Sequence, residues 1–282
     1  MIASFFALVP VRIHNIVGMP LMEAKGKKLL LLKFVERLTY LFATKLLTNS
    51  FGLQKYIANN LTKKQVTVVA KGSINGVNSE YFKNTYTDEE KNHTRNSLKI
   101  DKDAFVLIFV GRIVRDKGIN ELIEAFSQLK IIYPKLTLLL VGDYEEDLNP
   151  IKSENKIIID ESRDIISVGF QEDIRKYLGV ADLFVLPSYR EGLPNSLIEA
   201  GSFGLPLLAT DINGCNEIII ENETGILVEV KSTENLKNGM MKFLDDFTFY
   251  NKIKENVRQS ILSRYNQVDF LKELRSEIEK SL

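Results

Sequence analysis

Cysteine is almost absent from this sequence of 282 residues, which contains one, Cys215, with two histidines and no tryptophan. A single cysteine excludes an internal disulfide and fits a reducing compartment. Long hydrophobic runs are also missing, because the longest fall far short of the ~20 residues that span a bilayer. The first residues lack the basic start and the cleavage site of a signal peptide. We therefore expect a cytoplasmic protein.

Neither sign of charge is in excess, because 37 Lys and Arg balance 37 Asp and Glu. This balance gives no indication of a nucleic-acid partner. Two common phosphate-binding motifs, G-x-x-x-x-G-K-[ST] and G-x-G-x-x-G, are missing as well. Asp101-Lys-Asp103 has the spacing of a D-x-D metal motif. It precedes a predicted strand instead of ending one, so we interpret it as a solvated turn.

From residue 103 onward the sequence alternates between apolar strands and helices. The predicted strands are 104–110, 136–141, 165–168, 182–186, 206–209 and 226–228, and the predicted helices are 118–131, 171–180, 194–203, 214–220 and 233–244. This alternation is typical of an α/β fold with a parallel sheet covered on both faces. Residues 83–102 are polar and are predicted to be a surface connection.

One predicted strand is followed by a loop, a helix start and two glutamates. Residues 181–186 are the strand, Gly192 and Pro194 punctuate the loop, and Pro194 suits the first position of a helix. Glu191 lies on the loop and Glu199 in the helix, with seven residues between them. Helix starts bind anions, and a carboxylate among apolar neighbours needs a partner such as ligand hydroxyls. Alternatively, Glu191 is solvated and Glu199 faces water or a salt bridge.

A second polar loop follows the predicted strand 104–110, with the sequence Gly111-Arg-Ile-Val-Arg-Asp-Lys117-Gly118. Arg112 and Lys117 are suited to neutralise a diphosphate. A cation ~4 Å from a phosphate oxygen contributes about 4 kcal/mol at an effective dielectric of about 20, and arginine adds two-pronged geometry. The alternative is that both are surface cations at a strand end.

Together these two loops resemble a known enzyme family. Glu191-x7-Glu199, in the form R-E-G-L-P-N-S-L-I-E-A, looks like the E-x7-E signature of the retaining family 4 glycosyltransferases. Residues 111–118 match the G-R-x-x-x-x-K-G motif of the same family. The family has the GT-B fold, in which two Rossmann-like domains with parallel sheets face each other. The resemblance therefore implies a nucleotide-sugar donor.

The resemblance also assigns roles to single residues. It implies that Glu191 orients the donor sugar, that Arg112 and Lys117 stabilise the departing diphosphate, and that these three are the catalytic residues. Glu199 would hold the ribose hydroxyls. The other donor-binding residues of the glutamate motif would be Gly192, Leu193, Pro194, Asn195, Ser196 and Leu197.

Two further stretches resemble donor-binding segments of the family. Residues 71–82 are similar to the interdomain loop N-G-V-D-x-x-x-F, whose glycine, here Gly76, lies close to the donor. Asn78 replaces the usual aspartate of this loop. A strand end that meets the nucleotide base through its backbone would be formed by Val168, Gly169 and Phe170.

The resemblance covers almost the whole chain but weakens toward the N-terminus. We expect an acceptor-side domain in residues 1–80 and a donor-binding domain in residues 81–282. The family's opening strand and its glycine-rich loop have no counterpart here, and Val17 stands where many relatives have a histidine. We therefore expect an incomplete, N-terminally truncated acceptor domain and little transferase activity. His14, three residues earlier, is interpreted as a packed residue.

Residues 25–45 are predicted to contain an amphipathic helix with a basic approach. Its apolar face has helical spacing and consists of Leu31, Phe34, Val35, Leu38, Leu41 and Phe42. One interpretation is an ordinary packed helix whose polar face is solvated. The other is docking to anionic lipid headgroups at the inner face of the cell membrane, where each basic residue adds ~1 kcal/mol.

The predicted function is transfer of a sugar, with retention, from a UDP-sugar to an acceptor hydroxyl. The resemblance to surface-polysaccharide members implies a lipid-linked or oligosaccharide acceptor, and it implies no metal and no other cofactor. One alternative is a nucleotide-sugar 2-epimerase. Another is a nucleotide-sugar-binding remnant without turnover.

Overall fold

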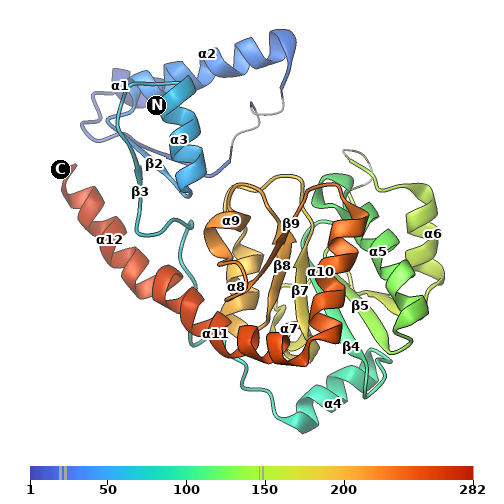
Figure 1. The fold of residues 1–282 in the computed structure, drawn as a ribbon. Helices are drawn as coiled ribbons and strands as arrows, with labels where there is room; N and C mark the ends of the chain where they lie inside the picture. Colours follow the sequence, from blue (N-terminus) through green and yellow to red (C-terminus); the bar gives the residue numbers. More distant parts are fainter. Residues whose placement is uncertain (19–20, 22–23, 146, 148, 282) are drawn as a thin grey trace. The chain divides into compact units, whose positions relative to one another are not determined.

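The computed structural model describes residues 1–18, 21, 24–145, 147 and 149–281. It confirms the predicted α/β class, with parallel strands throughout (Figure 1). Contacts divide the chain into two compact units. The first contains Met1–Asn78, Glu191–Pro194 and Arg264–Leu282, and the second contains Ser79–Arg190 and Asn195–Ser263. The proposed domains, residues 1–80 and 81–282, stay a prediction.

The first unit is built on a parallel sheet in the order β1-β2-β3. Its strands are β1 (Ile13–Ile16), β2 (Lys45–Thr48) and β3 (Val66–Val68), and its helices are α1 (Ile2–Phe6), α2 (Gly26–Phe42), α3 (Phe51–Asn60) and α12 (Gln267–Glu279). One core cluster includes Leu46 of β2, Tyr40 of α2 and Ile57 of α3. A second cluster joins Leu47 to Phe270 of α12. The C-terminal helix therefore completes the core of the N-terminal unit.

The second unit is built on a six-stranded parallel sheet in the order β6-β5-β4-β7-β8-β9. The strands are β4 (Phe105–Val110), β5 (Leu136–Val141), β6 (Ile165–Ser167), β7 (Leu183–Leu186), β8 (Leu207–Thr210) and β9 (Gly225–Val228). The helices are α4 (Asp88–Ser97), α5 (Ile119–Ile132), α6 (Ser153–Glu161), α7 (Arg175–Val180), α8 (Asn195–Phe203), α9 (Cys215–Ile218), α10 (Thr233–Asp245) and α11 (Phe247–Tyr265), the last of which ends beyond this unit. Strands β4, β5 and β7 are almost entirely buried, as their continuous apolar sequences predict.

The prediction for residues 83–102 was wrong, because this polar segment contains helix α4. The helix begins with a capping box in which Thr87 and Glu90 satisfy each other's backbone N–H groups. Arg95 then anchors it to the junction of α7 and β7 by donating to the carbonyl of Val180 and to the carboxylate of Asp182. A helix without an apolar stripe is therefore held by its cap and by one arginine. Strand β2 and helix α6 were also not predicted.

Helix α2 is the predicted basic amphipathic helix, and it packs on the core through Tyr40 with Leu29 and Leu32 beside it. Its apolar residues Phe34 and Leu41 are each 64% exposed, whereas Tyr40 is its one fully buried side chain. Burial, with the Glu36 carboxylate beside it, raises the pKa of Tyr40. His14 packs against Tyr40, with 5.8 Å between the ring centroids, and burial lowers its pKa. Helix α2 is therefore packed, with Leu29, Leu32 and Tyr40 at the core, but most of the face predicted to be apolar is exposed.

Candidate functional site

The topology of the second unit determines where a ligand would bind. Strand order reverses between the neighbouring strands β4 and β7, because the chain builds outward from β4 to β6 and then returns to β7. In open parallel sheets, ligands bind beyond the carboxyl ends of the strands at such a switch point. The loop that follows β4 contains Arg112 and Lys117, and the loop that follows β7 leads through Arg190 to helix α8. Both predicted motifs thus start at the switch point.

The two loops touch each other through their backbones. Tyr189 donates its backbone N–H to the carbonyl of Asp116 over 2.8 Å. Gly118, with φ of 72°, lies so close to Pro187 that a Cβ would collide with the Pro187 carbonyl. This close approach is the reason for glycine at position 118. It places the end of the cationic motif against the start of the glutamate motif.

Arg112 and Lys117 occupy different positions within their loop. Arg112 is exposed, and its Nη1 lies 2.5 Å from Oε2 of Glu145 in the loop after β5. Lys117 is half-buried at the end of a short 3-10 helix, Arg115–Lys117, just before α5. Any anion that binds Arg112 therefore competes with Glu145 or shares the guanidinium with it.

The predicted base-binding stretch ends strand β6. Asp143, which follows β5, accepts the backbone N–H of Phe170 over 2.8 Å, and Gly142 donates its N–H to the carbonyl of Gly169 over 2.9 Å. These bonds hold residues 168–170 beside the end of β5. The Phe170 side chain is 70% exposed. The sequence prediction missed this supporting role of Asp143, although an aspartate two residues after a buried strand is a recognisable signal.

Helix α8 places Glu199 in an unusual environment. The helix begins at Asn195, one residue after the predicted start at Pro194, and it buries Leu197 and Ile198 while Ser196 is half-exposed. Burial alone raises the pKa of the Glu199 carboxyl, and no charged or hydrogen-bonding neighbour in the described residues opposes this effect. Desolvation without a partner is the situation that ligand hydroxyls would relieve.

Residues 191–194, which start at Glu191 and lead to helix α8, belong to the first unit. The backbone at Gly192 approaches Val17 so closely that a Cβ would collide with the Val17 carbonyl. Leu193 is buried, and one of its methyl carbons lies 3.4 Å from the ideal Cβ position of Gly72. Glu191 at the start of this segment is half-exposed. Within the first unit, then, residues 191–194 pack on the segment that contains Val17.

The backbone conformation and the packing at position 76 both require glycine. Its φ is 65°, and a Cβ there would meet the backbone of Gln267 at 2.7 Å. Its neighbour Val77 forms a bridge with Asn266, at the junction of α11 and α12. Glycine is therefore required by a tight approach inside the first unit, and its predicted contact with a donor stays a prediction.

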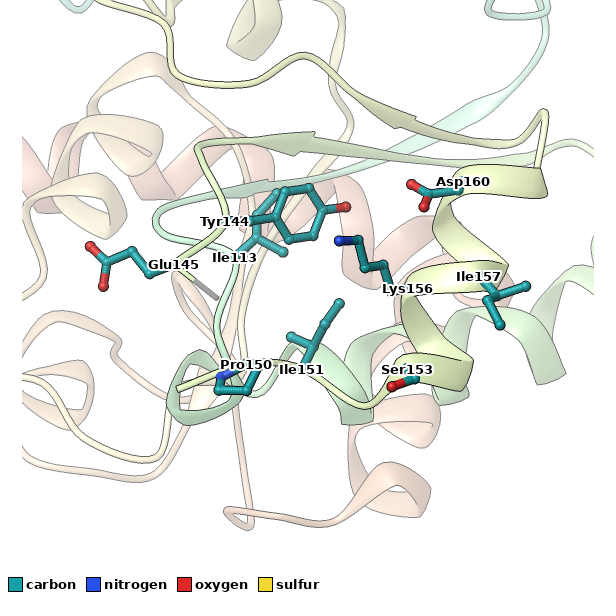
Figure 2. Close-up of a pocket in the computed structure, with 9 residues that line it drawn as sticks. All are labelled: Ile113, Tyr144, Glu145, Pro150, Ile151, Ser153, Lys156, Ile157 and Asp160. Atoms are coloured by element: carbon teal, nitrogen blue, oxygen red, sulfur yellow. The ribbon is translucent and has the colours of Figure 1, made fainter. Parts of the chain in front are cut away.

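A cavity of about 330 Å³ lies between the loop after β5 and helix α6 (Figure 2). Its lining residues are Ile113, Tyr144, Glu145, Pro150, Ile151, Ser153, Lys156, Ile157 and Asp160. The Lys156 ammonium lies 5.6 Å from the centre of the Tyr144 ring. None of the predicted site residues lines this cavity, although Glu145 in its wall also pairs with Arg112.

The described residues show neither a metal-binding cluster nor a membrane-spanning helix. They contain no group of three or more His, Cys, Asp or Glu side chains arranged to hold a metal ion. No helix among them combines the length and the hydropathy needed to cross a bilayer. The expectation of a metal-free site stays a prediction.

Comparison with known proteins gives a consistent result. The family described as glycosyl transferases group 1 matches residues 90–260. The capsular polysaccharide biosynthesis glycosyltransferase CapM of Staphylococcus aureus is 31% identical over 281 residues, which cover 98% of this chain and 72% of that protein. In Escherichia coli, the UDP-Gal:alpha-D-GlcNAc-diphosphoundecaprenol alpha-1,3-galactosyltransferase is 29% identical over 281 residues, covering 97% of this chain and 70% of the enzyme.

Solved structures show the same fold. Anabaena Alr3699/HepE in complex with UDP-glucose aligns with a TM-score of 0.86 at 23% identity, covering 99% of this chain and 74% of that chain. The sucrose-phosphate synthase of Thermosynechococcus elongatus aligns with a TM-score of 0.79 at 22% identity, covering 96% and 68%. These likenesses confirm the predicted GT-B-like class of α/β fold.

Proposed function

Since the chain belongs to the glycosyl transferases group 1, we propose that it transfers a hexose from a UDP-sugar to an acceptor hydroxyl with retention. The acceptor is a lipid-linked saccharide or an oligosaccharide, and the product is a surface polysaccharide. The observation that carries the proposal is Glu199, in the helix that follows the switch point, a desolvated carboxylate for which the described part of the chain supplies no charged or hydrogen-bonding partner. The relatives named for capsular polysaccharide synthesis and for UDP-Gal support the choice of substrates.

In this reaction the bond between the anomeric carbon and the phosphate oxygen breaks, and UDP leaves with the bonding electrons. The acceptor oxygen bonds to the anomeric carbon and releases its proton. Arg112 and Lys117 lower the barrier because the negative charge on the diphosphate grows as the bond breaks. These two cations take the place of a metal ion, and no cofactor is needed. Glu191 orients the sugar, and Glu199 accepts hydrogen bonds from the ribose.

Calorimetry with UDP, with and without EDTA, tests the donor site. We expect binding that EDTA does not change. Arg112→Ala should weaken UDP binding far more than uridine binding, because the guanidinium contacts only the diphosphate. Arg115→Ala is the matched control, since Arg115 is an exposed arginine of the same loop without a predicted role. Binding that disappears with EDTA, or equal losses for UDP and uridine, would contradict the assignment.

The identity of the reaction is tested by product analysis with UDP-sugars and a diphospholipid-linked saccharide. A glycosyltransferase releases UDP and extends the acceptor. A 2-epimerase would instead release UDP together with a 2-epimeric free sugar or return an epimeric nucleotide sugar, and a binding remnant would give no product at all. The family match favours the transferase over both alternatives.

We also propose that α2 holds the protein at the inner face of the membrane, where a lipid-linked acceptor is presented. Its outward side is apolar, with Leu30 68%, Leu31 62% and Phe34 64% exposed. Lys27 and Lys28 are exposed at its N-terminal end. A helix with an outward apolar stripe and basic flanks lies in the plane of an anionic interface.

The only acidic residue of α2, Glu36, does not disturb this surface, because its Oε2 is buried. Charge therefore favours an anionic lipid surface over a second protein as the partner of the stripe. Sedimentation with vesicles of phosphatidylglycerol and phosphatidylcholine tests the proposal. Leu31→Gln/Phe34→Gln should lower vesicle binding more than tenfold, as expected from the apolar area withdrawn, and Lys27→Gln/Lys28→Gln should do so only with the anionic lipid.

The controls remove comparable side chains from the second unit. Phe247 is 75% exposed and Ile131 is 84% exposed, so Phe247→Gln/Ile131→Gln removes similar apolar surface. Equal losses for this control and the α2 variant would contradict a specific docking face. A concentration-dependent dimer that the α2 variant abolishes, without vesicle binding by the parent protein, would instead identify a second copy as the partner.

A further inference from the structure

An ion pair joins the two loops of the switch point. The Nε and Nη2 atoms of Arg190 lie 2.9 and 2.5 Å from Oδ2 of Asp116. Asp116 directly precedes Lys117, and Arg190 directly precedes Glu191. Neither charged residue of the pair belongs to the predicted donor contacts. The pair nevertheless connects the residue before the diphosphate cation with the residue before the sugar-binding glutamate.

The surroundings of Asp116 distinguish this pair from an ordinary surface salt bridge. The Asp116 side chain is only 15% exposed, and its Oδ1 is buried without a hydrogen bond. A largely desolvated carboxylate depends on its cation, so Arg190 compensates a charge that is mostly shielded from water. The backbone bond from Tyr189 to the Asp116 carbonyl lies beside the pair. One residue thus holds the β7 loop through both its backbone and its side chain.

A second anchor fixes the same loop one residue earlier. The Tyr189 hydroxyl donates to Oε1 of Glu121 in the first turn of α5 over 2.6 Å. Burial and the Glu121 carboxylate raise the pKa of Tyr189. Lys231 lies over the Tyr189 ring, 4.9 Å from its centre. The side chains of Tyr189 and Arg190 therefore bind Glu121 and Asp116, two residues of the segment that begins at Asp116.

We propose that Asp116 and Arg190 are positioning residues, which set the sugar-binding end of the β7 loop relative to the diphosphate-binding end of the β4 loop. The proposal rests on the proposed function for its consequence, because transfer requires both ends of the donor to be held in one geometry. Misplacement of a reacting group by about 1 Å can lower a rate 100-fold. The ion pair acts only through Glu191 and Lys117 and does not touch the donor.

Asp116 and Arg190 are not equivalent partners, so their substitutions should have different effects on UDP binding and on the mobility of the loop. Asp116→Asn removes a negative charge next to Lys117, so UDP binding should stay the same or become tighter. Arg190→Gln leaves the Asp116 carboxylate buried without its cation, so it should loosen the loop more than Asp116→Asn does. The double variant should resemble Asp116→Asn, because the uncompensated charge is gone.

Hydrogen exchange on the whole chain, without ligand, tests the structural half of the proposal. We expect the Tyr189 amide to exchange about tenfold faster in Asp116→Asn, with an unchanged urea midpoint. Asp173→Asn is the control, since it removes an ion pair of the same kind, with Arg175 at 2.6 Å, from another loop, where the carboxylate is 45% exposed and desolvation is small. Unchanged exchange at Tyr189 in both single variants would overturn the proposal.

Affinities for UDP and for UDP-glucose or UDP-galactose test the functional half. The ratio of the affinity for UDP-sugar to that for UDP should fall about tenfold in Asp116→Asn and remain unchanged in Asp173→Asn. A fall in UDP affinity of the same size would show instead that Asp116 serves the diphosphate site alone. If the parent protein bound no UDP, the proposed function would fail, whereas the exchange result would still decide the role of the pair.

Discussion

Helices α5 and α2 are both amphipathic, yet they leave very different amounts of apolar surface exposed. Helix α5 buries Leu122, Phe126 and Leu129 and leaves its polar side toward solvent. Helix α2 buries Tyr40 and leaves Phe34 and neighbouring apolar residues exposed. An apolar stripe therefore predicts a helix in both cases, but it does not predict what covers the stripe. In α5 the protein's own core covers it, and in α2 we propose that lipid does.

The largest effect that separates the two helices is on stability. Phe126→Ala should lower the free energy of unfolding by about 3–5 kcal/mol, because it leaves a cavity in a packed core. Phe34→Ala should change it by no more than about 0.5 kcal/mol, as is usual for an exposed position. Urea unfolding of both variants measures the difference. Similar losses would show that something in the folded chain covers Phe34.

A smaller effect on stability concerns the carboxylate of Glu199. It lies in helix α8, which buries apolar side chains as α5 does. Because burial raises the pKa of Glu199 above its ordinary value of 4.5, the folded protein holds this proton to a higher pH than the unfolded chain does. The contribution of Glu199 to stability therefore falls as pH rises through that interval. Glu199→Gln should be more stable than the parent by about 1–3 kcal/mol at pH 8, with the difference shrinking toward pH 4.

The same substitution should impair function. Loss of a hydrogen bond between the carboxylate and ribose costs about 1.5–3 kcal/mol, so UDP binding should weaken while binding of 2′-deoxy-UDP changes less. Unfolding curves at several pH values and calorimetry with both nucleotides provide the measurements. A variant that is less stable at pH 8 and binds both nucleotides normally would make Glu199 a structural residue.

The smallest effect concerns the inward side of α2. The Tyr40 hydroxyl is buried without a hydrogen bond of normal geometry. Tyr40→Phe should therefore leave stability unchanged or raise it by up to about 1 kcal/mol, since no bond is lost and a desolvated polar group is removed. Thermal unfolding checks this. A clear loss of stability would mean that the hydroxyl bonds to Glu36 in solution and fixes the orientation of α2.

Sequence patterns predicted the second unit better than the first. Buried parallel strands are continuous apolar runs, so β4, β5 and β7 were located within one residue at each end. Helix α4 was missed because its sequence has no apolar stripe. Its capping signal, Thr87 with Glu90, was present and would have identified the start.

The candidate site was predicted as two motifs, and the family match supports the enzyme class. The ion pair of Asp116 with Arg190 was not predicted, because nothing local relates two charges that lie 74 residues apart. The packing of Gly192 on Val17 was likewise invisible, since it joins segments distant in the chain. Predicted roles for single residues, such as Glu191 and Gly76, stay predictions.

The sequence by itself determined the strands of the second unit and the residues that stand at their ends, because backbone geometry depends on neighbours a few positions away. Only the tertiary structure decided which side of α2 faces inward, which unit receives residues 191–194 and α12, and which charge compensates Asp116. Those outcomes depend on contacts between distant segments, where shape and desolvation, and not local periodicity, select the partner.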